Sequence, residues 1–184
     1  MNDVLLLVDV VNDFQHDDGE ALLRTFRARH EGLVAALDHA RASGIPVVYA
    51  NDDWGRWDGD APKLVRDAIE HGPAGGLIAA VQPQGGDRFI LKRRYSAFDS
   101  TPLAILLEEL EIERILLAGM ATEMCVAQTA IAAREHGYKV TVLAEACAYV
   151  DADDERIALA YLERVAGARV ERSSAPLERL TAGR

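Results

Sequence analysis

The chain has 184 residues, of which 49% are hydrophobic and 27% are charged, and its formal net charge is −10. This composition is typical of a soluble globular protein with one sizeable core, so we expect a single domain over residues 1–184. The negative charge argues against nucleic acid and against an anionic membrane surface as partners, since both require a basic face on the protein.

The sequence shows no targeting segment that we can identify. The first three residues lack the basic side chains of a signal peptide, and Asp9 interrupts the apolar run that follows them. No apolar stretch approaches the roughly 18 residues of a membrane-spanning helix. The two cysteines, Cys125 and Cys147, have neither CxxC nor zinc spacing. We therefore expect no disulfide framework and a cytoplasmic location.

Short runs rich in Val, Ile and Leu alternate along the chain with apolar residues at helical spacing. The predicted strands are 4–10, 45–50, 88–92, 114–120, 139–144 and 168–172. Each of the first five is followed by a predicted helix: one that ends before Gly44, one that starts at Asp60, one that opens at Ser100, one from Thr122 to His136, and one that opens at Asp153. The polar tail after Ser173 is expected to be poorly held.

This alternation predicts an α/β fold with three layers, in which a doubly wound, six-stranded and mostly parallel sheet carries helices on both faces. Sites in such sheets form at the carboxyl ends of the strands. Asp9 ends the first predicted strand, Lys92 ends the third, and Cys125 follows the fourth. We therefore expect these three side chains at one edge of the sheet.

Cys125 has two interpretations. A lone cysteine on an Ala-rich helix is most often a buried small hydrophobic residue. Here the predicted helix N-terminus would instead favour a thiolate. The small residues of segment 118–122 would also let backbone N–H groups face a substrate oxygen. Cys147 has no such setting, and we interpret it as packing.

Asp9 and Lys92 are each ambiguous alone. A buried aspartate is often paired for structural reasons, and a lysine at a strand end is often solvated. Together with a thiol they form a consistent set, because Lys92 favours both anions and Asp9 can accept the thiol proton.

Three segments carry a family resemblance. Leu6–Phe14, Lys92–Phe98 (KRRYSAF) and Ala118–Val126 (AGMATEMCV) resemble, in order and spacing, motifs of the isochorismatase-like hydrolases. This family includes nicotinamidases, N-carbamoylsarcosine and ureido amidohydrolases, and isochorismatases.

The resemblance implies a role for each residue of the set. Cys125 would be the nucleophile, Asp9 the base, and Lys92 the cation that keeps both ionised. It also implies a cis peptide between Met120 and Ala121, with the N–H groups of Ala121 and Cys125 forming an oxyanion hole. Family members commonly form homo-oligomers, so we expect the same here.

Two departures from the family pattern stand out. Asn12 occupies a position where many members carry Gln. Nicotinamidases bind a metal through an Asp and nearby histidines after the second strand, whereas the corresponding segment here, 51–57, contains no His. We therefore predict no metal and no cofactor, and we disfavour nicotinamide as the substrate.

Aromatic and basic residues follow several predicted strands. As a group the aromatic residues would wall a small apolar pocket, although each is as readily explained by loop packing. They are Phe14, Trp54, Trp57, Tyr95 and Phe98. Each of Arg56, Arg93 and Arg94 is either a solvated surface charge or a bidentate partner for a substrate carboxylate, and the sequence leaves this open.

The combined prediction is an enzyme that hydrolyses the C–N bond of a small amide or ureido compound through a cysteine thioester. Two alternatives stay open. One is an isochorismatase-type hydrolase of an enol ether, which needs no thiol. The other is a non-catalytic protein that binds a small ligand on the same fold.

Overall fold

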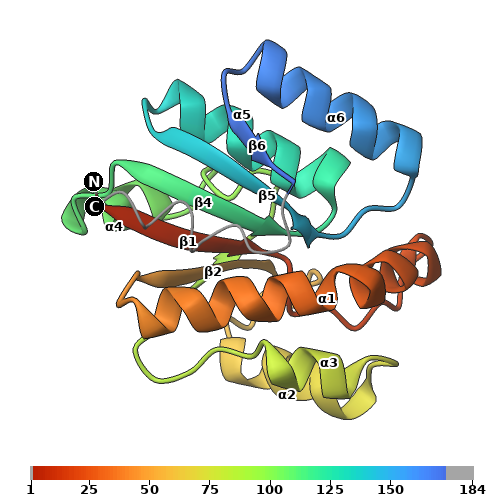
Figure 1. Cartoon of the computed structure of the whole chain (residues 1–184). Coiled ribbons are helices and arrows are strands. Elements are labelled where there is room, and N and C mark those ends of the chain that lie inside the picture. The colour runs from red at the N-terminus through yellow and green to blue at the C-terminus, as the bar shows by residue number, and fades with distance from the viewer. Residues whose placement is uncertain (1, 173–184) are drawn as a thin grey trace.

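The computed structural model describes residues 2–172, so the predicted polar tail after Ser173 lies outside the described residues. Six strands form one sheet in which every neighbouring pair is parallel, in the order β3-β2-β1-β4-β5-β6 (Figure 1). Their bounds are β1 Asp3–Val8, β2 Val47–Asp52, β3 Arg88–Lys92, β4 Arg114–Gly119, β5 Lys139–Cys147 and β6 Arg169–Glu171. The predicted six-stranded α/β fold is confirmed.

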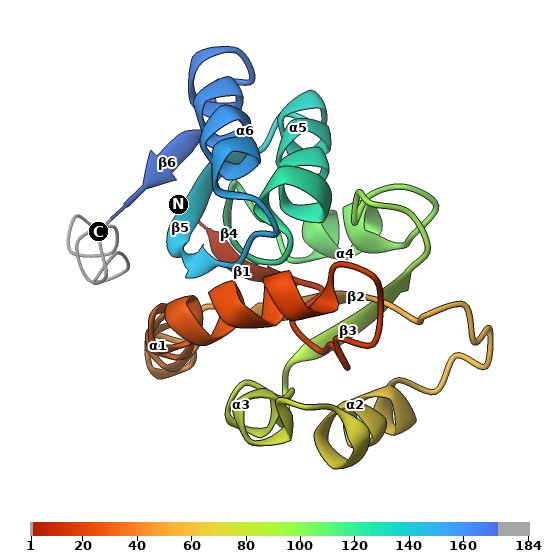
Figure 2. The same ribbon diagram turned by 90° about the vertical axis from the view of Figure 1, so that its right-hand side faces the viewer.

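Helices cover both faces of the sheet. The bounds are α1 Gly19–Ala42, α2 Ala61–His71, α3 Gly75–Ala80, α4 Leu103–Glu109, α5 Ala127–Glu135 and α6 Ala152–Arg164, with a π-helical turn, η1, at Thr122–Val126. Helices α1, α2 and α3 lie on one side of the sheet, and α5 and α6 lie on the other (Figure 2). The doubly wound, three-layer arrangement is therefore observed.

The centre of the sheet is apolar on both faces, as a strand between two helical layers requires. All six residues of β1, with the sequence DVLLLV, are buried. Its one acidic residue, Asp3, pairs with Arg114 on the adjacent strand β4. Burial on both faces explains why β1 is an uninterrupted apolar run rather than an alternating pattern.

The strand order reverses between β1 and β4, because successive strands are added outward from β1 on one side and outward from β4 on the other. A crevice forms at the carboxyl ends of the strands at such a reversal. Gly119 ends β4 with φ of 129°, and a Cβ there would lie 2.0 Å from the carbonyl oxygen of Val8. The close approach of these two strand ends thus requires glycine and sets the floor of the crevice.

Helix starts were less well predicted than strands. Asp60 does cap α2, since its side chain accepts from the Lys63 N–H. Thr122 was expected to cap a helix, but its hydroxyl donates to the Ala148 carbonyl instead, and a π-helical turn precedes α5. The cap of α6 is Asp151 rather than Asp153, because Asp151 accepts from the N–H groups of Asp153 and Asp154.

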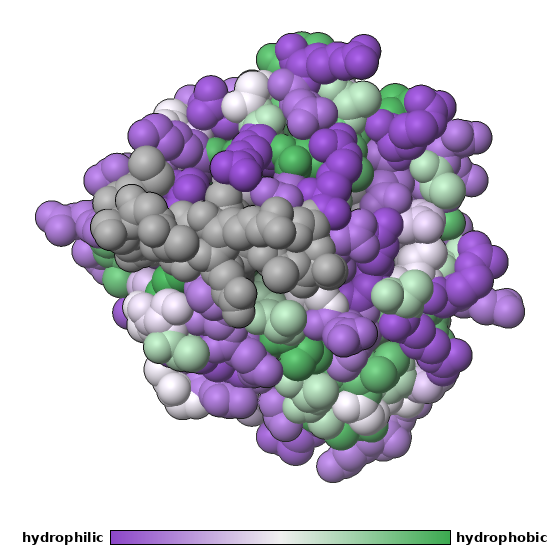
Figure 3. All heavy atoms as spheres, in the orientation of Figure 1, coloured by the Kyte–Doolittle hydropathy of each residue, from purple (hydrophilic) through white to green (hydrophobic). Residues whose placement is uncertain are grey.

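The surface seen in Figure 3 is largely hydrophilic, with apolar residues in small separate groups. Among the helices of residues 2–172, none combines the length and apolar character that crossing a membrane requires.

Candidate active site

Asp9, Lys92 and Cys125 meet at the carboxyl edge of the sheet. The Lys92 ammonium nitrogen lies 2.7 Å from Asp9 Oδ2 and 3.5 Å from Cys125 Sγ. The same nitrogen donates a third hydrogen bond to the Arg94 carbonyl oxygen at 3.1 Å. Lys92 is only 1% exposed, so all three of its N–H donors are committed inside the protein. The sequence prediction that these three residues lie together agrees with this geometry.

Backbone geometry places each member of this set. Asp9 directly follows β1 with φ of 54°, and its Oδ1 accepts the Asp52 N–H at 2.7 Å. Asp52 pairs in register with Lys92, so β2 and β3 bring both residues to the same level. Cys125 lies in the segment 120–126, which we call the nucleophile turn.

Charges in this set are strongly coupled. Burial raises the pKa of Asp9 above its usual value, although Lys92, Cys125 and the Asp52 N–H oppose that rise. Burial alone would lower the pKa of Lys92, but Asp9 and Cys125 outweigh it and the pKa is raised. Asp9 is therefore a stronger base than an exposed carboxylate, and Lys92 stays charged.

The thiol itself departs from our expectation of a lowered pKa. Burial and the charge of Asp9 raise the pKa of Cys125 to about 12, and Lys92 only partly offsets this. Cys125 does lie in the first helical turn after β4, as expected, but that turn is π-helical and runs directly into α5. The resting thiol is therefore neutral and hydrogen-bonded to Asp9, which is placed to receive its proton.

The nucleophile turn also carries the backbone groups expected for an oxyanion hole. The Met120–Ala121 peptide is cis, as the family resemblance implied. The Ala121 carbonyl accepts from the N–H groups of Met124 and Val126. The turn is fixed to β1 through the Met120 N–H and to β5 through the Thr122 N–H, which donate to Val8 and Ala148.

Alkylation provides a first test of this setting. We expect iodoacetamide to label Cys125 and to leave Cys147 unmodified in the native protein. Cys125 is half-buried beside its proton acceptor, whereas Cys147 is 0% exposed and its pKa is raised to about 12 by burial. Peptide mapping after alkylation measures both sites, with Cys125→Ser as the control. Preferential labelling of Cys147 in folded protein would contradict the assignment.

The segment after β2 is organised around the buried carboxylate of Asp53. Its oxygens accept from the N–H groups of Gly55 and Trp57 and pair with the Arg93 guanidinium. Arg93 in turn stacks on the Trp57 ring, with its Cζ 3.2 Å from the ring centroid. A guanidinium thus already neutralises the one buried acid of this segment.

These residues do not fit a metal ion. Within residues 2–172, no three His, Cys, Asp or Glu side chains gather as a metal site. The segment after β2 has no imidazole, and Asp53 is committed to Arg93 and two N–H groups.

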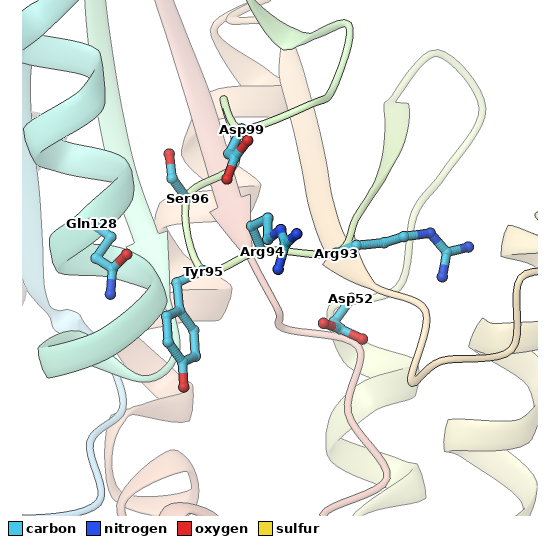
Figure 4. Close-up of a pocket in the computed structure, with 7 residues that line it drawn as sticks. All are labelled: Asp52, Arg93, Arg94, Tyr95, Ser96, Asp99 and Gln128. Carbon is cyan, nitrogen blue, oxygen red and sulfur yellow. The ribbon is translucent and has the colours of Figure 1, made fainter.

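A cavity of about 480 Å³ lies among the segments that follow β2 and β3 and the start of α5, and none of the three residues lines it (Figure 4). Its lining comes from segments that also carry the set: Asp52 bonds Asp9, Arg93 and Arg94 follow Lys92, and Gln128 lies one helical turn beyond Cys125. The residues that line it are Asp52, Arg93, Arg94, Tyr95, Ser96, Asp99 and Gln128. Sequence reasoning missed Asp52, although its place at a strand end was a usable signal, and it missed Gln128.

Of the five aromatic residues expected to wall a pocket, Tyr95 lines this cavity and is 56% exposed. Trp57 is 75% exposed under Arg93, and Trp54 is half-buried under Arg56. Neither tryptophan lines this cavity, and neither does Phe14 or Phe98, whose rings are buried. Phe14 packs against Phe26 and Phe98 stacks on His136, at 5.4 and 4.8 Å between ring centroids.

Comparison with known proteins gives concordant results. A family model described as the isochorismatase domain matches residues 3–173. An uncharacterized isochorismatase family protein of Bacillus subtilis, YaaI, is 31% identical over 90% of this chain and 91% of its own length. Maleamate amidohydrolase of Pseudomonas putida is 33% identical over 62% of this chain and 60% of its own.

Solved structures agree with the sequence matches. Nicotinamidase of Staphylococcus aureus superposes with a TM-score of 0.74 at 28% identity, covering 94% of this chain and 98% of that one. N-carbamoylsarcosine amidase of Thermoplasma acidophilum gives a TM-score of 0.70 at 29% identity, with 94% and 96% covered.

Proposed function

This chain belongs to the isochorismatase family, and we propose that it is a cysteine-dependent hydrolase that cleaves a C–N bond of a small amide or ureido compound. The observation that carries the proposal is the contact of the Lys92 ammonium with both Asp9 and Cys125. Its relatives include proteins named as amidohydrolases and amidases, which supports the reaction class.

The proposed reaction begins with attack of the Cys125 sulfur on the substrate carbonyl carbon as the thiol proton passes to Asp9. The N–H groups of Ala121 and Cys125 hold the oxyanion. Asp9 returns the proton to the leaving nitrogen, and the C–N bond breaks to leave a thioester. Water then attacks the thioester, with Asp9 as base, and releases the acid and the free thiol.

Release of ammonia or amine from a panel of amides, ureas and carbamoyl compounds tests this reaction class directly. The proposal requires that at least one compound of the panel is turned over by the wild-type protein and none by Cys125→Ala. An enol ether as the sole substrate class would support the isochorismatase alternative instead.

We also propose that Arg94 binds an acidic group of the substrate. The ion pairs of the three arginines that the sequence left open support this choice. Arg56 pairs with Asp67, and Arg93 pairs with Asp53. Arg94 lines the cavity and has no acidic partner within ion-pair distance among residues 2–172 (Figure 4).

Two acids share the cavity with Arg94, and neither competes strongly for it. Asp52 accepts the Trp54 N–H and lies close enough to Lys92 to raise the pKa of that ammonium. Asp99 is exposed and accepts the Ser100 hydroxyl. A guanidinium left in this position is suited to two parallel hydrogen bonds with a carboxylate.

Arg94→Met should therefore alter specificity. Against a matched pair such as succinamate and its neutral analogue 4-oxopentanamide, we expect kcat/KM for the acid to fall about 10- to 100-fold, since a hydrogen bond to a charged group contributes about 1.5–3 kcal/mol. The neutral amide should change less than about threefold on the same scale. Arg88→Met, far from the cavity at the start of β3, is the matched control. Equal loss for both amides would contradict the role.

Absence of a metal requirement is a further expectation. Asp53 already pairs with Arg93, and its segment offers no imidazole ligand. Elemental analysis of the purified protein and assay after chelation should show no stoichiometric metal and unchanged turnover. Stoichiometric zinc, iron or manganese, together with activity that chelation removes, would overturn this expectation.

A further inference from the structure

The nucleophile turn is tied to the start of α6 by one carboxylate. Glu123 lies two residues before Cys125, and its Oε1 accepts the Val150 N–H at 2.7 Å and the Asp151 N–H at 3.2 Å. Asp151 is the N-cap of α6, so the Glu123 side chain alone joins the nucleophile turn to the N-terminus of that helix. In Figure 1 the start of α6 lies beside the start of α5.

A second carboxyl group, from the first turn of α6, faces the same junction. Glu155 is only 8% exposed and lies on α6, which packs against the π-helical turn that contains Glu123. Glu155 Oε1 and Glu123 Oε2 are both buried, and within the described chain neither has a hydrogen-bond partner. Two such oxygens at one junction are unfavourable if both groups are ionised, and are satisfied if one proton lies between them.

Burial and two nearby acids raise the pKa of Glu155, and one nearby cation opposes them. Among residues 2–172, the cation that pairs with it is Arg29 of α1, which lies 2.6 Å from Glu145 of β5 and 3.7 Å from Glu155. Burial raises the pKa of Glu155, Arg29 opposes this, and the charges of Glu123 and Glu145 raise the pKa further. Arg29 thus lies closer to Glu145 than to Glu155, so it only partly compensates the burial of Glu155.

We infer that Glu123 is a positioning residue for the nucleophile turn, and that Glu155 donates a proton to Glu123 Oε2, directly or across one water molecule. The clamp has two halves: Glu123 Oε1 holds the backbone before α6, and Glu155 holds Glu123 Oε2. The nucleophile turn carries Cys125 and the N–H groups of the proposed oxyanion hole, where a displacement of about 1 Å can lower the rate about 100-fold.

This inference rests on the proposed function only where turnover is measured, so the test also uses readouts that need no substrate. Three variants separate the halves of the clamp. Glu123→Ala removes both. Glu123→Gln keeps an oxygen for the Val150 and Asp151 N–H groups and adds a donor toward Glu155. Glu155→Gln supplies a permanent neutral donor to Glu123. Glu163→Gln, which changes an exposed acid near the far end of α6, is the control.

We expect Glu123→Ala to slow alkylation of Cys125 and to lower kcat, each about 10-fold or more, with KM within about threefold of wild type. Glu123→Gln should restore both values to within about threefold on the same scale. If Cys125→Ala shows the proposed chemistry to be wrong, the alkylation rates still test the clamp. Wild-type alkylation of Cys125 in folded Glu123→Ala would overturn it.

Thermal unfolding at several pH values tests the shared proton. A carboxyl group with a raised folded pKa binds an extra proton in the native state, so stability falls as pH rises from about 4.3 through the folded pKa. We expect wild type and Glu163→Gln to show this decline in Tm and Glu155→Gln to show a smaller one, because Asp9, whose pKa is also raised, contributes equally in all three proteins. An equal decline in Glu155→Gln would overturn the proton assignment, and this comparison holds even if Glu123→Ala does not fold.

Discussion

Cys125→Ala should abolish turnover on the best substrate found, with a loss of about 10⁴-fold or more, because the variant retains a folded site with no nucleophile. Alanine fills most of the space of the thiol, and Cys125 is half-buried, so the fold should be kept. Turnover measured beside circular dichroism checks both parts. Cys147→Ala is the matched control, since that thiol lies in the core and is 0% exposed.

The same substitution separates the proposed function from its two alternatives. An isochorismatase-type reaction proceeds by protonation at carbon, for which Asp9 alone is sufficient, so loss of the thiol would be nearly harmless. A non-catalytic binding protein would turn over nothing in the panel with or without Cys125. Substantial activity retained by Cys125→Ala would therefore overturn the amidohydrolase proposal.

Lys92→Met should lower kcat about 100-fold or more at neutral pH. The methionine is similar in length but removes the charge that lies 2.7 Å from Asp9 Oδ2. Burial already raises the pKa of Asp9, and Lys92 is the main group that opposes the rise. Without it Asp9 is protonated over a wider pH range and cannot accept the thiol proton, while the pKa of Cys125 rises further.

The same substitution should also shift the pH dependence of activity in a defined direction. Activity requires Asp9 to be ionised, and a raised pKa moves that ionisation to higher pH. The acidic limb of kcat/KM in Lys92→Met should therefore shift toward alkaline pH, with some activity recovered as pH rises. Lys139→Met, which removes an exposed lysine at the start of β5, is the control. Wild-type turnover and an unchanged thiol pKa in Lys92→Met would mean that Lys92 is only structural.

The strands of the sheet could be predicted from the sequence because parallel strands buried on both faces consist of consecutive apolar residues. The predicted strand at 88–92 coincides with β3, and the other strands differ at their ends. β1 stops at Val8 rather than at residue 10, because Asp9 has a positive φ that leaves the extended conformation. β5 extends to Cys147, beyond the predicted end at residue 144, where the register against β4 shifts.

Helices that lack a clear apolar stripe or cap were harder to predict. Helix α1 begins at Gly19. The sequence predicted its end but not this start, because the first half of the helix mixes Leu22, Leu23 and Phe26 with many charged residues. Helix α3 was missed, since it is short and begins with two glycines. The π-helical turn around Cys125 depends on its junctions with β5 and α6, which no local pattern encodes.

The candidate site was predictable as a set of strand ends and not as a network of partners. Parallel topology alone brings Asp9, Lys92 and Cys125 to one edge. That Arg93 pairs with Asp53, while Arg94 has no acidic partner among residues 2–172, depends on side-chain directions that follow from the tertiary fold. For the same reason the interior packing of Phe98 against His136 could not be read from its place beside Ser96 and Ala97.

The covalent intermediate is the most direct test of the central claim that Cys125 is the nucleophile of an acyl-transfer reaction. Wild-type protein is mixed with its best amide or ureido substrate, quenched in acid during turnover, digested and measured by mass spectrometry. We predict a mass increase equal to the acyl or carbamoyl group on the peptide that contains Cys125, absent from Cys125→Ala and from protein quenched without substrate. Rapid turnover with no adduct on Cys125 at any quench time, together with activity in Cys125→Ala, would contradict the account.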